Sequence, residues 1–523
     1  MNAKQFLLLL HTVEHLRVQQ LVYQVKNRLW QPRLTAAVCE GVVPLALERP
    51  VVKYRCLVAE GRFDFLNLEA KPASWNDTTN GMLWAYNLNY MDWLNQAGMD
   101  YETGAEWIDK FLDEMGENRV GLDPYPTALR GINWIKFVSV HREHLETDRL
   151  KRWNDSLYAQ YVLLVKKLEY HLLGNHLLED AYSLFMAALY FRDMSFYRKA
   201  VKLLRTELDE QLLADGAHYE QSPMYHCILF DRLLDCYNAS LHNSVFEGQD
   251  DVTALLRTKA VAMAGHLASV VYADGSIPLL NDSAEGIAPT AGQLFDYARR
   301  LGLSWTEIPL GACGYRKLVN GNFEAIVDVG NVTAAYQPGH THADTFNYEL
   351  RLKGEPFVVD TGISTYNKTG RRQYERSTAA HNTVTVGDRD SSEVWGGFRV
   401  GRRARVTLQV DEPQRVKALH TGYGKACRHT RTFELTDNGF RIIDELPGTT
   451  EGISRLHLAP GVTVEAVSPS RICTNRSIIE VEGATDIKVE NGRLSTCYNR
   501  FQPSQTVLIR FAGRMCYTII CTK

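Results

Sequence analysis

The chain has 523 residues, of which 45% are hydrophobic and 23% charged, so it can bury two large cores and is too apolar to remain disordered. Its formal net charge of -3 shows no basic excess, which argues against a nucleic-acid partner and leaves any anionic ligand to local arginine clusters. Such clusters occur at Arg371, Arg372 and Arg376 and at Arg399, Arg402, Arg403 and Arg405.

The first residues superficially resemble an export signal. The apolar run 6–10 is short, however, and His11, Glu14 and Arg17 follow it at once. We therefore predict an amphipathic first helix, no membrane span, and a cytoplasmic rather than a periplasmic location. The ten cysteines show no zinc-ribbon or redox spacing, which also favours buried thiols in a reducing compartment.

From the start to about residue 305 the apolar residues recur at helical spacing, as at Leu177, Ala181 and Leu184. Turn-rich pieces containing Gly or Pro separate the helical stretches. Many antiparallel helices of this length predict an (α/α) toroid, which we assign to residues 1–310.

After about residue 310 the pattern changes to alternation rich in β-branched and aromatic residues, as in 323–329 and 383–386. Short strands bounded by Gly, Asn and Pro turns continue to the end. We predict an antiparallel β-sandwich for residues 311–523, and hence a multidomain α and β protein.

Two polar clusters lie in the helical half. In the first, Asn175, His176 and Glu179 stand at the start of an apolar helix, where free N–H groups attract anions. A simple helix cap would explain Asn175 equally well. In the second, Ser222 and Pro223 predict a helix start that places Tyr225 in the first turn, although a lone tyrosine can also be a packing residue.

A third cluster lies in the β half, where His340 and His342 share one face if their segment is a strand. His342, Asp360 and His381 have the side-chain types of a divalent metal site, zinc in particular. A polar loop network without metal is the alternative.

Several separate motifs occur together and in a fixed order: residues 86–90, 123–126, 175–176, 222–226, 340–344 and 377–382. Through them the sequence resembles the heparinase II/III-like polysaccharide lyases over nearly its whole length. The resemblance implies an (α/α) toroid joined to an antiparallel β-sandwich, with the substrate cleft between them.

The resemblance also implies roles for individual residues. It places the group that neutralises the substrate carboxylate at Asn175, with His176 and Glu179 beside it, and the catalytic tyrosine at Tyr225. His340 corresponds to the additional base of the family. The metal site of some relatives corresponds to His342, Asp360 and His381.

We therefore expect a polysaccharide lyase that cleaves an anionic, uronic-acid-containing polysaccharide by β-elimination, with zinc or another divalent metal in the β domain and no organic cofactor. Further substrate contacts are expected from Glu179, Tyr86, Asn89, Arg130 and Arg376.

Two other functions fit the residues less well. A glycoside hydrolase on the same kind of toroid would use two carboxylic groups, for which Glu179, Asp180 and Glu220 are available. A non-catalytic exopolysaccharide or capsule-assembly factor would not need Asn175, Tyr225 and His340 together. Product analysis separates the enzymes, because only a lyase leaves an ultraviolet-absorbing C4–C5 double bond.

Overall fold

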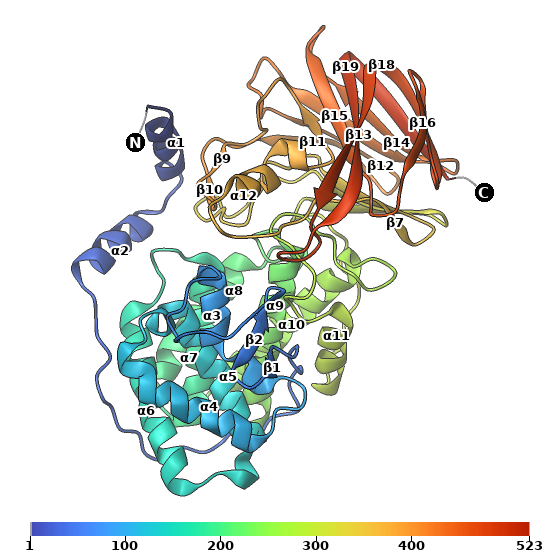
Figure 1. The fold of residues 1–523 in the computed structure, drawn as a ribbon. Coiled ribbons are helices and arrows are strands. Elements are labelled where there is room, and N and C mark those ends of the chain that lie inside the picture. Colours follow the sequence, from blue (N-terminus) through green and yellow to red (C-terminus); the bar gives the residue numbers. More distant parts are fainter. Residues whose placement is uncertain (1–2, 522–523) are drawn as a thin grey trace.

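A computed structural model describes residues 3–521 and shows a helical part followed by a β-sheet part, as predicted (Figure 1). The main helices of the first part are α3 (Met82–Tyr90), α4 (Tyr101–Glu114), α5 (Pro124–Val140), α6 (Thr147–Lys167), α7 (Gly174–Phe191), α8 (Met194–Gln211), α9 (Pro223–His242), α10 (Gln249–Val270) and α11 (Ala291–Arg300).

Helix α7 lies at the centre of the helical part and carries the first polar cluster. Its residues are almost all buried, because it is apolar on every side except at its N-terminal end. Helix α9 begins at Pro223 with Ser222 as its N-cap, and the Ser222 hydroxyl accepts a hydrogen bond from the Tyr225 N–H at 3.2 Å. The predicted start of this helix is confirmed.

The segment before α3 differs from the continuous helical pattern that we predicted. Residues 30–56 contain no helix or named strand, and β1 (Leu57–Ala59), β2 (Arg62–Phe65) and β3 (Leu68–Ala70) form a small antiparallel sheet. Phe63 and Phe65 alternate onto one face of β2, where their rings lie 5.2 Å from those of Trp93 and Trp84. The alternation of apolar residues in this short strand was therefore not recognised, because helical spacing dominates the sequence around it.

The β-sheet part consists of two antiparallel sheets packed face to face. The smaller contains β4 (Tyr315–Val319), β5 (Phe323–Asp328), β6 (Tyr348–Leu352) and β7 (Glu355–Val358). The larger contains β8 (Val384–Thr385), β11 (Val406–Glu412), β12 (Arg415–His420), β13 (His429–Leu435), β14 (Phe440–Glu445), β15 (Glu451–His457), β16 (Val464–Ser468), β17 (Arg471–Thr474), β18 (Ser477–Leu494) and β19 (Gln502–Cys521).

One buried core lies between these sheets, and the hydroxyls of Tyr348 and Tyr517 meet across it at 3.1 Å. The short helix α12 (Gly370–Glu375) and the two-stranded ribbon of β9 (Val394–Trp395) and β10 (Arg399–Val400) lie outside the two sheets. The expected division near residue 310 falls in the segment between α11 and β4.

Helices α1 (Ala3–Val13) and α2 (Val18–Leu29) lie on one side of the molecule (Figure 1). Across residues 3–521, no helix is both long and apolar enough to cross a bilayer.

Candidate active site

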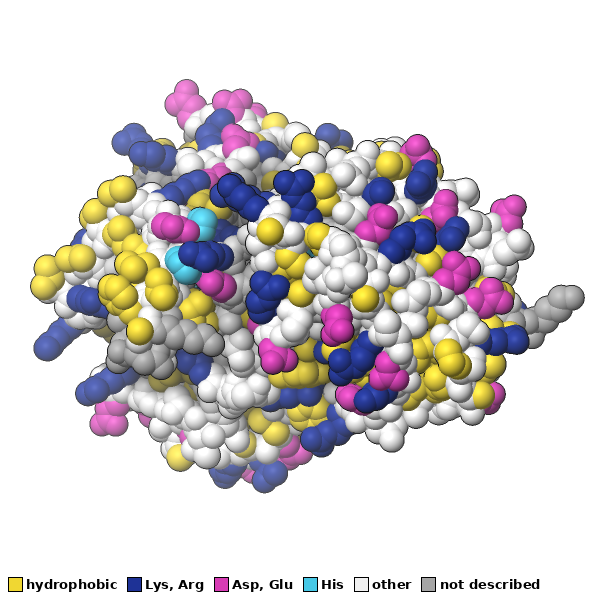
Figure 2. Space-filling view, turned by 90° about the horizontal axis from the view of Figure 1, so that it is seen from above, with side chains coloured by type: hydrophobic (Ala, Val, Ile, Leu, Met, Phe, Trp, Pro, Cys, Tyr) yellow, Lys and Arg dark blue, Asp and Glu magenta, His cyan; other side chains and the backbone are white. Residues whose placement is uncertain are grey.

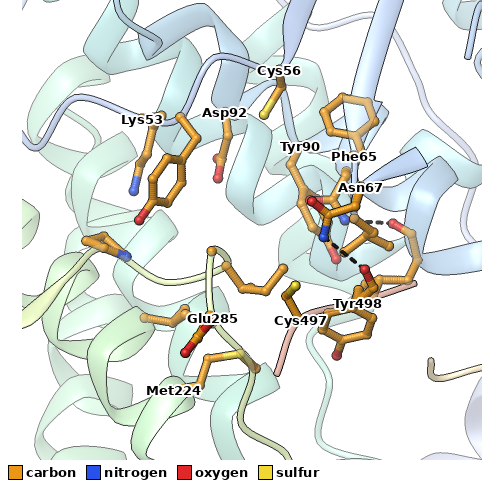
Figure 3. Close-up of a pocket in the computed structure, with 18 of the residues that line it drawn as sticks. Lys53, Cys56, Phe65, Asn67, Tyr90, Asp92, Met224, Glu285, Cys497 and Tyr498 are labelled. Atoms are coloured by element: carbon orange, nitrogen blue, oxygen red, sulfur yellow. Dashed lines mark hydrogen bonds between the residues drawn. The ribbon is translucent and has the colours of Figure 1, made fainter. Parts of the chain in front are cut away.

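A cavity of ≈ 460 Å³ lies where the helical part meets the β-sheet part. Lys53 and Asn67 of the N-terminal segment, Tyr225 of α9, and Tyr366 and Tyr498 of the β part all line it. Figure 3 shows a hydrogen bond between two lining residues: the Asn67 side-chain amide donates to the Tyr498 carbonyl at 2.9 Å. This bond links the helical part to the β-sheet part. Segments distant in sequence therefore form one cavity.

Tyr225 lies on the wall of this cavity, and its ring stacks on that of His340 with 3.8 Å between centroids. The Tyr366 hydroxyl donates a hydrogen bond to the Tyr225 oxygen at 3.4 Å. Burial raises the pKa of Tyr225, so its phenol holds its proton at neutral pH. Tyr225 and His340 are thus brought together from different parts of the fold.

The His340 ring is held by Asp282, whose Oδ2 lies 3.0 Å from Nδ1. Asp282 is itself buried and accepts a hydrogen bond from Arg372 at 2.7 Å. Burial alone would raise the pKa of Asp282. Arg372 and the two neighbouring histidines outweigh burial and hold this pKa well below its usual value. The Asp282 carboxylate favours a proton on Nδ1 of His340, and the Glu220 carboxylate lies 3.4 Å from the other ring nitrogen, Nε2.

Asn175 faces that Nε2 atom, with its amide nitrogen 3.4 Å away. The same amide donates to the Glu220 carboxylate at 2.9 Å, and the backbone N–H of Asn175 donates to it at 2.9 Å. Leu173 occupies the N-cap position of α7 without a side-chain cap bond, so Asn175 does not cap this helix. Its amide is instead directed at the site.

Gly174 permits this approach of α7 to Glu220. Its φ is +61°, and an added Cβ would lie 2.5 Å from the Glu220 Oε1 atom. A side chain at position 174 would therefore displace the Glu220 carboxylate that bonds Asn175.

His176 and Glu179 have different surroundings although both lie near the start of α7. The His176 ring packs on Tyr125 with 4.5 Å between centroids, and its Nδ1 lies 3.1 Å from Glu169. Burial disfavours the charged ring, but Glu169 and nearby carboxylates outweigh it and raise the pKa of His176. Glu179 is fully buried behind Arg232 at 3.8 Å, and burial raises its pKa to about 7.

Four of the five expected substrate contacts are fully buried in this structure, namely Glu179, Asn89, Arg130 and Arg376. Asn89 donates to the carbonyls of Trp75 and Ala85. Arg130 donates to Gln160, and Arg376 donates to the Thr341 carbonyl.

None of the four buried residues lines the cavity, so none is positioned to contact a substrate there. Tyr86 is half-buried, and its hydroxyl donates to Asp123 at 2.9 Å.

Residues that the sequence motifs did not indicate also line the cavity. Arg232 lies there with Lys53 and Asp231, and carboxylates surround its guanidinium, the nearest, Asp231, at 3.2 Å. Asp282 and Tyr366 were missed as well. Only the helical position of Arg232, seven residues after Tyr225 and therefore on the same face, could have indicated one of them.

The predicted metal ligands lie behind His340. His381 Nδ1 is 2.8 Å from Asp360 Oδ2, His342 Nε2 is 2.8 Å from Asp282 Oδ1, and the two rings lie 5.3 Å apart. The remaining nitrogen of each ring is buried without a hydrogen-bond partner among the described residues. Histidines held by carboxylates on one nitrogen and open on the other fit a metal site.

A second set of donors is grouped more tightly. Within residues 3–521, Asp215, His266 and Cys313 are the one group of three whose ligand atoms all lie within 4.8 Å of one another. All three are buried, and Nδ1 of His266 has no hydrogen-bond partner there. This group could hold a metal, and it differs from the group that the sequence indicated.

Comparison with known proteins gives a consistent assignment. Residues 130–297 match the model described as Heparinase II/III N-terminus, and residues 305–521 match Heparinase II/III-like, C-terminal. A heparin-sulfate lyase of Bacteroides stercoris is 23% identical over 447 residues, which are 73% of this chain and 64% of that protein. The chain thus spans less than two thirds of this curated relative.

Solved structures share the fold. A crystal structure of heparinase III has a TM-score of 0.66 at 15% identity and covers 95% of this chain and 89% of its own. A heparan sulfate lyase from Pedobacter heparinus has a TM-score of 0.58 at 17% identity, covering 96% and 88%. The two matched models and the shared fold show that this chain belongs to the heparinase II/III-like family.

Proposed function

We propose that this protein is a polysaccharide lyase that cleaves a uronic-acid-containing polysaccharide by β-elimination. The observation that carries the proposal is the stacking of Tyr225, which lines the cavity, on the buried ring of His340 beside the Asn175 amide. In this proposal Tyr225 serves as the acid, His340 as the base and the Asn175 amide as the donor to the carboxylate of one sugar residue. The family membership and the named activities of the relatives support the same chemistry.

The first requirement is to stabilise the charge that develops when the C5 proton leaves. A uronate carboxylate opposes this step because it already carries a negative charge. The Asn175 amide, with His176 nearby, offers preorganised donors to that carboxylate. Glu220 competes for the Asn175 protons, so a bound carboxylate has to share the amide with it.

The second requirement is to move two protons. In our proposal Nε2 of His340 takes the C5 proton, the electron pair forms the C4–C5 double bond, and the bond from C4 to its oxygen breaks. The phenol of Tyr225 gives its proton to that leaving oxygen, which fits its raised pKa. Asp282 stabilises the protonated His340 ring through Nδ1.

We also propose that His342, Asp360 and His381 hold zinc or another divalent metal, because two of their ring nitrogens are buried without a partner among the residues described. When bound, the metal would supply a fixed positive charge behind the site. The chain's own contribution is to orient His342 through Asp282, which also holds His340.

A panel of polymers tests the activity. Heparan sulfate, hyaluronan, alginate and a bacterial exopolysaccharide would be incubated with the full chain, and ultraviolet absorption of unsaturated products would be recorded. We expect an absorbing product from at least one glucuronate- or iduronate-type polymer. New reducing ends without absorbance on any polymer would instead establish a hydrolase, and no cleavage of any would favour a non-catalytic role.

A further inference from the structure

An exposed apolar surface lies on helices α1 and α2, which with Trp30 we call the amphipathic arm (residues 3–30). The arm carries nearly half of all the large apolar side chains that are exposed among the described residues. They are Phe6, Leu7, Leu10, Val13, Val18, Leu21, Val22, Val25, Leu29 and Trp30. Such a concentration in a small part of the surface marks an interaction site.

These side chains follow helical spacing and form one face on each helix. In α2, Val18, Leu21, Val22, Val25 and Leu29 recur at intervals of three and four. An amphipathic helix normally turns such a face towards the protein core. Here the apolar face is turned outwards.

The opposite faces of the arm are docked on the body through polar contacts. Gln20 of α2 is buried and donates to the carbonyls of Leu172 and Tyr336, each at 3.2 Å. On α1, His11 lies 2.8 Å from Glu393, and Thr12 accepts a hydrogen bond from the Trp395 indole at 3.1 Å. Both helices therefore have a defined orientation that leaves their apolar faces in water.

Positive charge surrounds this apolar surface. Lys26, Arg28 and Arg33 are exposed on or just after the arm, and Arg402 and Arg405 are exposed on the segment after β10, which contacts α1. Figure 2 shows apolar side chains gathered on the left, the side on which Figure 1 places α1 and α2, with Lys and Arg side chains around them.

Basic side chains outnumber the carboxylates on and beside the arm. Glu14 is exposed, Glu393 lies 2.8 Å from His11, and Glu210 forms an ion pair with Arg17. The surface around the arm therefore has a positive excess.

We infer that the amphipathic arm binds the surface of an anionic phospholipid membrane, with the apolar faces of α1 and α2 inserted at the level of the headgroups. A helix with one apolar face and flanking Lys and Arg residues is suited to this interface. A second copy of the chain fits less well, because two such surfaces would bring their basic residues face to face. No residue of the arm lines the cavity, and the inference does not depend on the proposed lyase activity.

Vesicle flotation of the full chain tests the inference. Vesicles of phosphatidylcholine alone would be compared with vesicles containing phosphatidylglycerol, at low and at physiological salt. We expect at least tenfold stronger binding to the anionic vesicles, and weaker binding as the salt rises. Equal or absent binding to the two kinds of vesicle would overturn the inference.

Two variants separate the apolar from the electrostatic contribution. Leu21→Ser with Val25→Ser should lower binding at least tenfold, whereas Leu241→Ser, at an exposed apolar site on α9, should leave it unchanged. Lys26→Ser with Arg28→Ser should lower binding about thirtyfold, since each charge near an anionic surface contributes about a fivefold factor.

Circular dichroism melting would check that each variant is folded, and the charge variant remains informative if the apolar one is not. Cleavage of soluble polymer should stay at the wild-type rate in all three variants. If the apolar variant binds vesicles normally but converts a dimer into a monomer in sedimentation analysis, the arm is a contact between copies and the inference is wrong.

Discussion

Replacement of Tyr225 by phenylalanine separates catalysis from stability at this site. The ring and its stacking on His340, at 3.8 Å between centroids, are kept. The change removes one hydrogen bond, from Tyr366 at 3.4 Å, which is at the long limit for such a bond. We therefore expect the free energy of unfolding to fall by no more than about 1 kcal/mol.

The effect of Tyr225→Phe on turnover should be much larger. In the proposed mechanism the Tyr225 hydroxyl, whose pKa is raised by burial, donates a proton to the leaving oxygen, so its loss leaves that step without a general acid. A loss of about 10²–10⁴-fold in kcat is expected, equivalent to about 3–5 kcal/mol in the barrier. Initial rates of unsaturated-product formation at saturating substrate would measure it.

Tyr366→Phe is the matched control, because it deletes the same 3.4 Å hydrogen bond from its other partner and leaves the Tyr225 phenol in place. We expect less than a tenfold loss. A folded Tyr225→Phe variant that keeps near-normal turnover on the true substrate would refute the reasoning and leave Tyr225 as a packing residue.

Three further results are expected. Asp282→Asn should lower kcat by at least 10- to 100-fold and change the pH profile of the rate, because an amide no longer fixes the tautomer of His340; an unchanged profile would count against this role. Glu179 has its pKa raised to about 7 by burial, so the native state binds the extra proton and wild-type stability should fall as pH rises from about 4.5 to 7. Glu179→Gln should remove this decline, which amounts to up to about 3 kcal/mol of unfolding free energy. Thermal melts of the two proteins at pH 5 and pH 8 would measure it. If the pKa of Glu179 were ordinary, the two proteins would show the same change in stability between these pH values. After cobalt substitution, metal analysis should detect bound cobalt in the wild-type protein and not in His381→Ala. A thiolate-to-cobalt absorption band that disappears in Cys313→Ser would instead place the metal at Asp215, His266 and Cys313.

The order of helices and strands was predictable because it depends on local periodicity. The start of α9 at Ser222 and Pro223 follows from the capping preferences of these two residues alone. The short sheet around Phe63 was not predictable, since three or four alternating residues do not outweigh a helical background.

The hydrogen-bond partners of buried charged residues could not be predicted from the sequence either. Arg130 and Arg376 lie in or near the characteristic motifs, and an arginine in such a place is easily interpreted as a contact to an anion. Their hydrogen bonds to an amide and a carbonyl can be identified only when the chain is folded. Asp282 was missed for a similar reason, because its partner His340 lies 58 residues later.

The proposed acid and base lie on different parts of the fold, since Tyr225 belongs to α9 and His340 to the segment between β5 and β6. The proposed mechanism therefore requires both parts of the fold in their docked arrangement, and neither part alone would be active. A displacement of about 1 Å between catalytic groups can cost on the order of a hundredfold in rate. A chain with its helical part folded and its sheets still unpaired would thus be inert towards polysaccharide, and loss of cleavage during gentle denaturation should precede loss of helical signal.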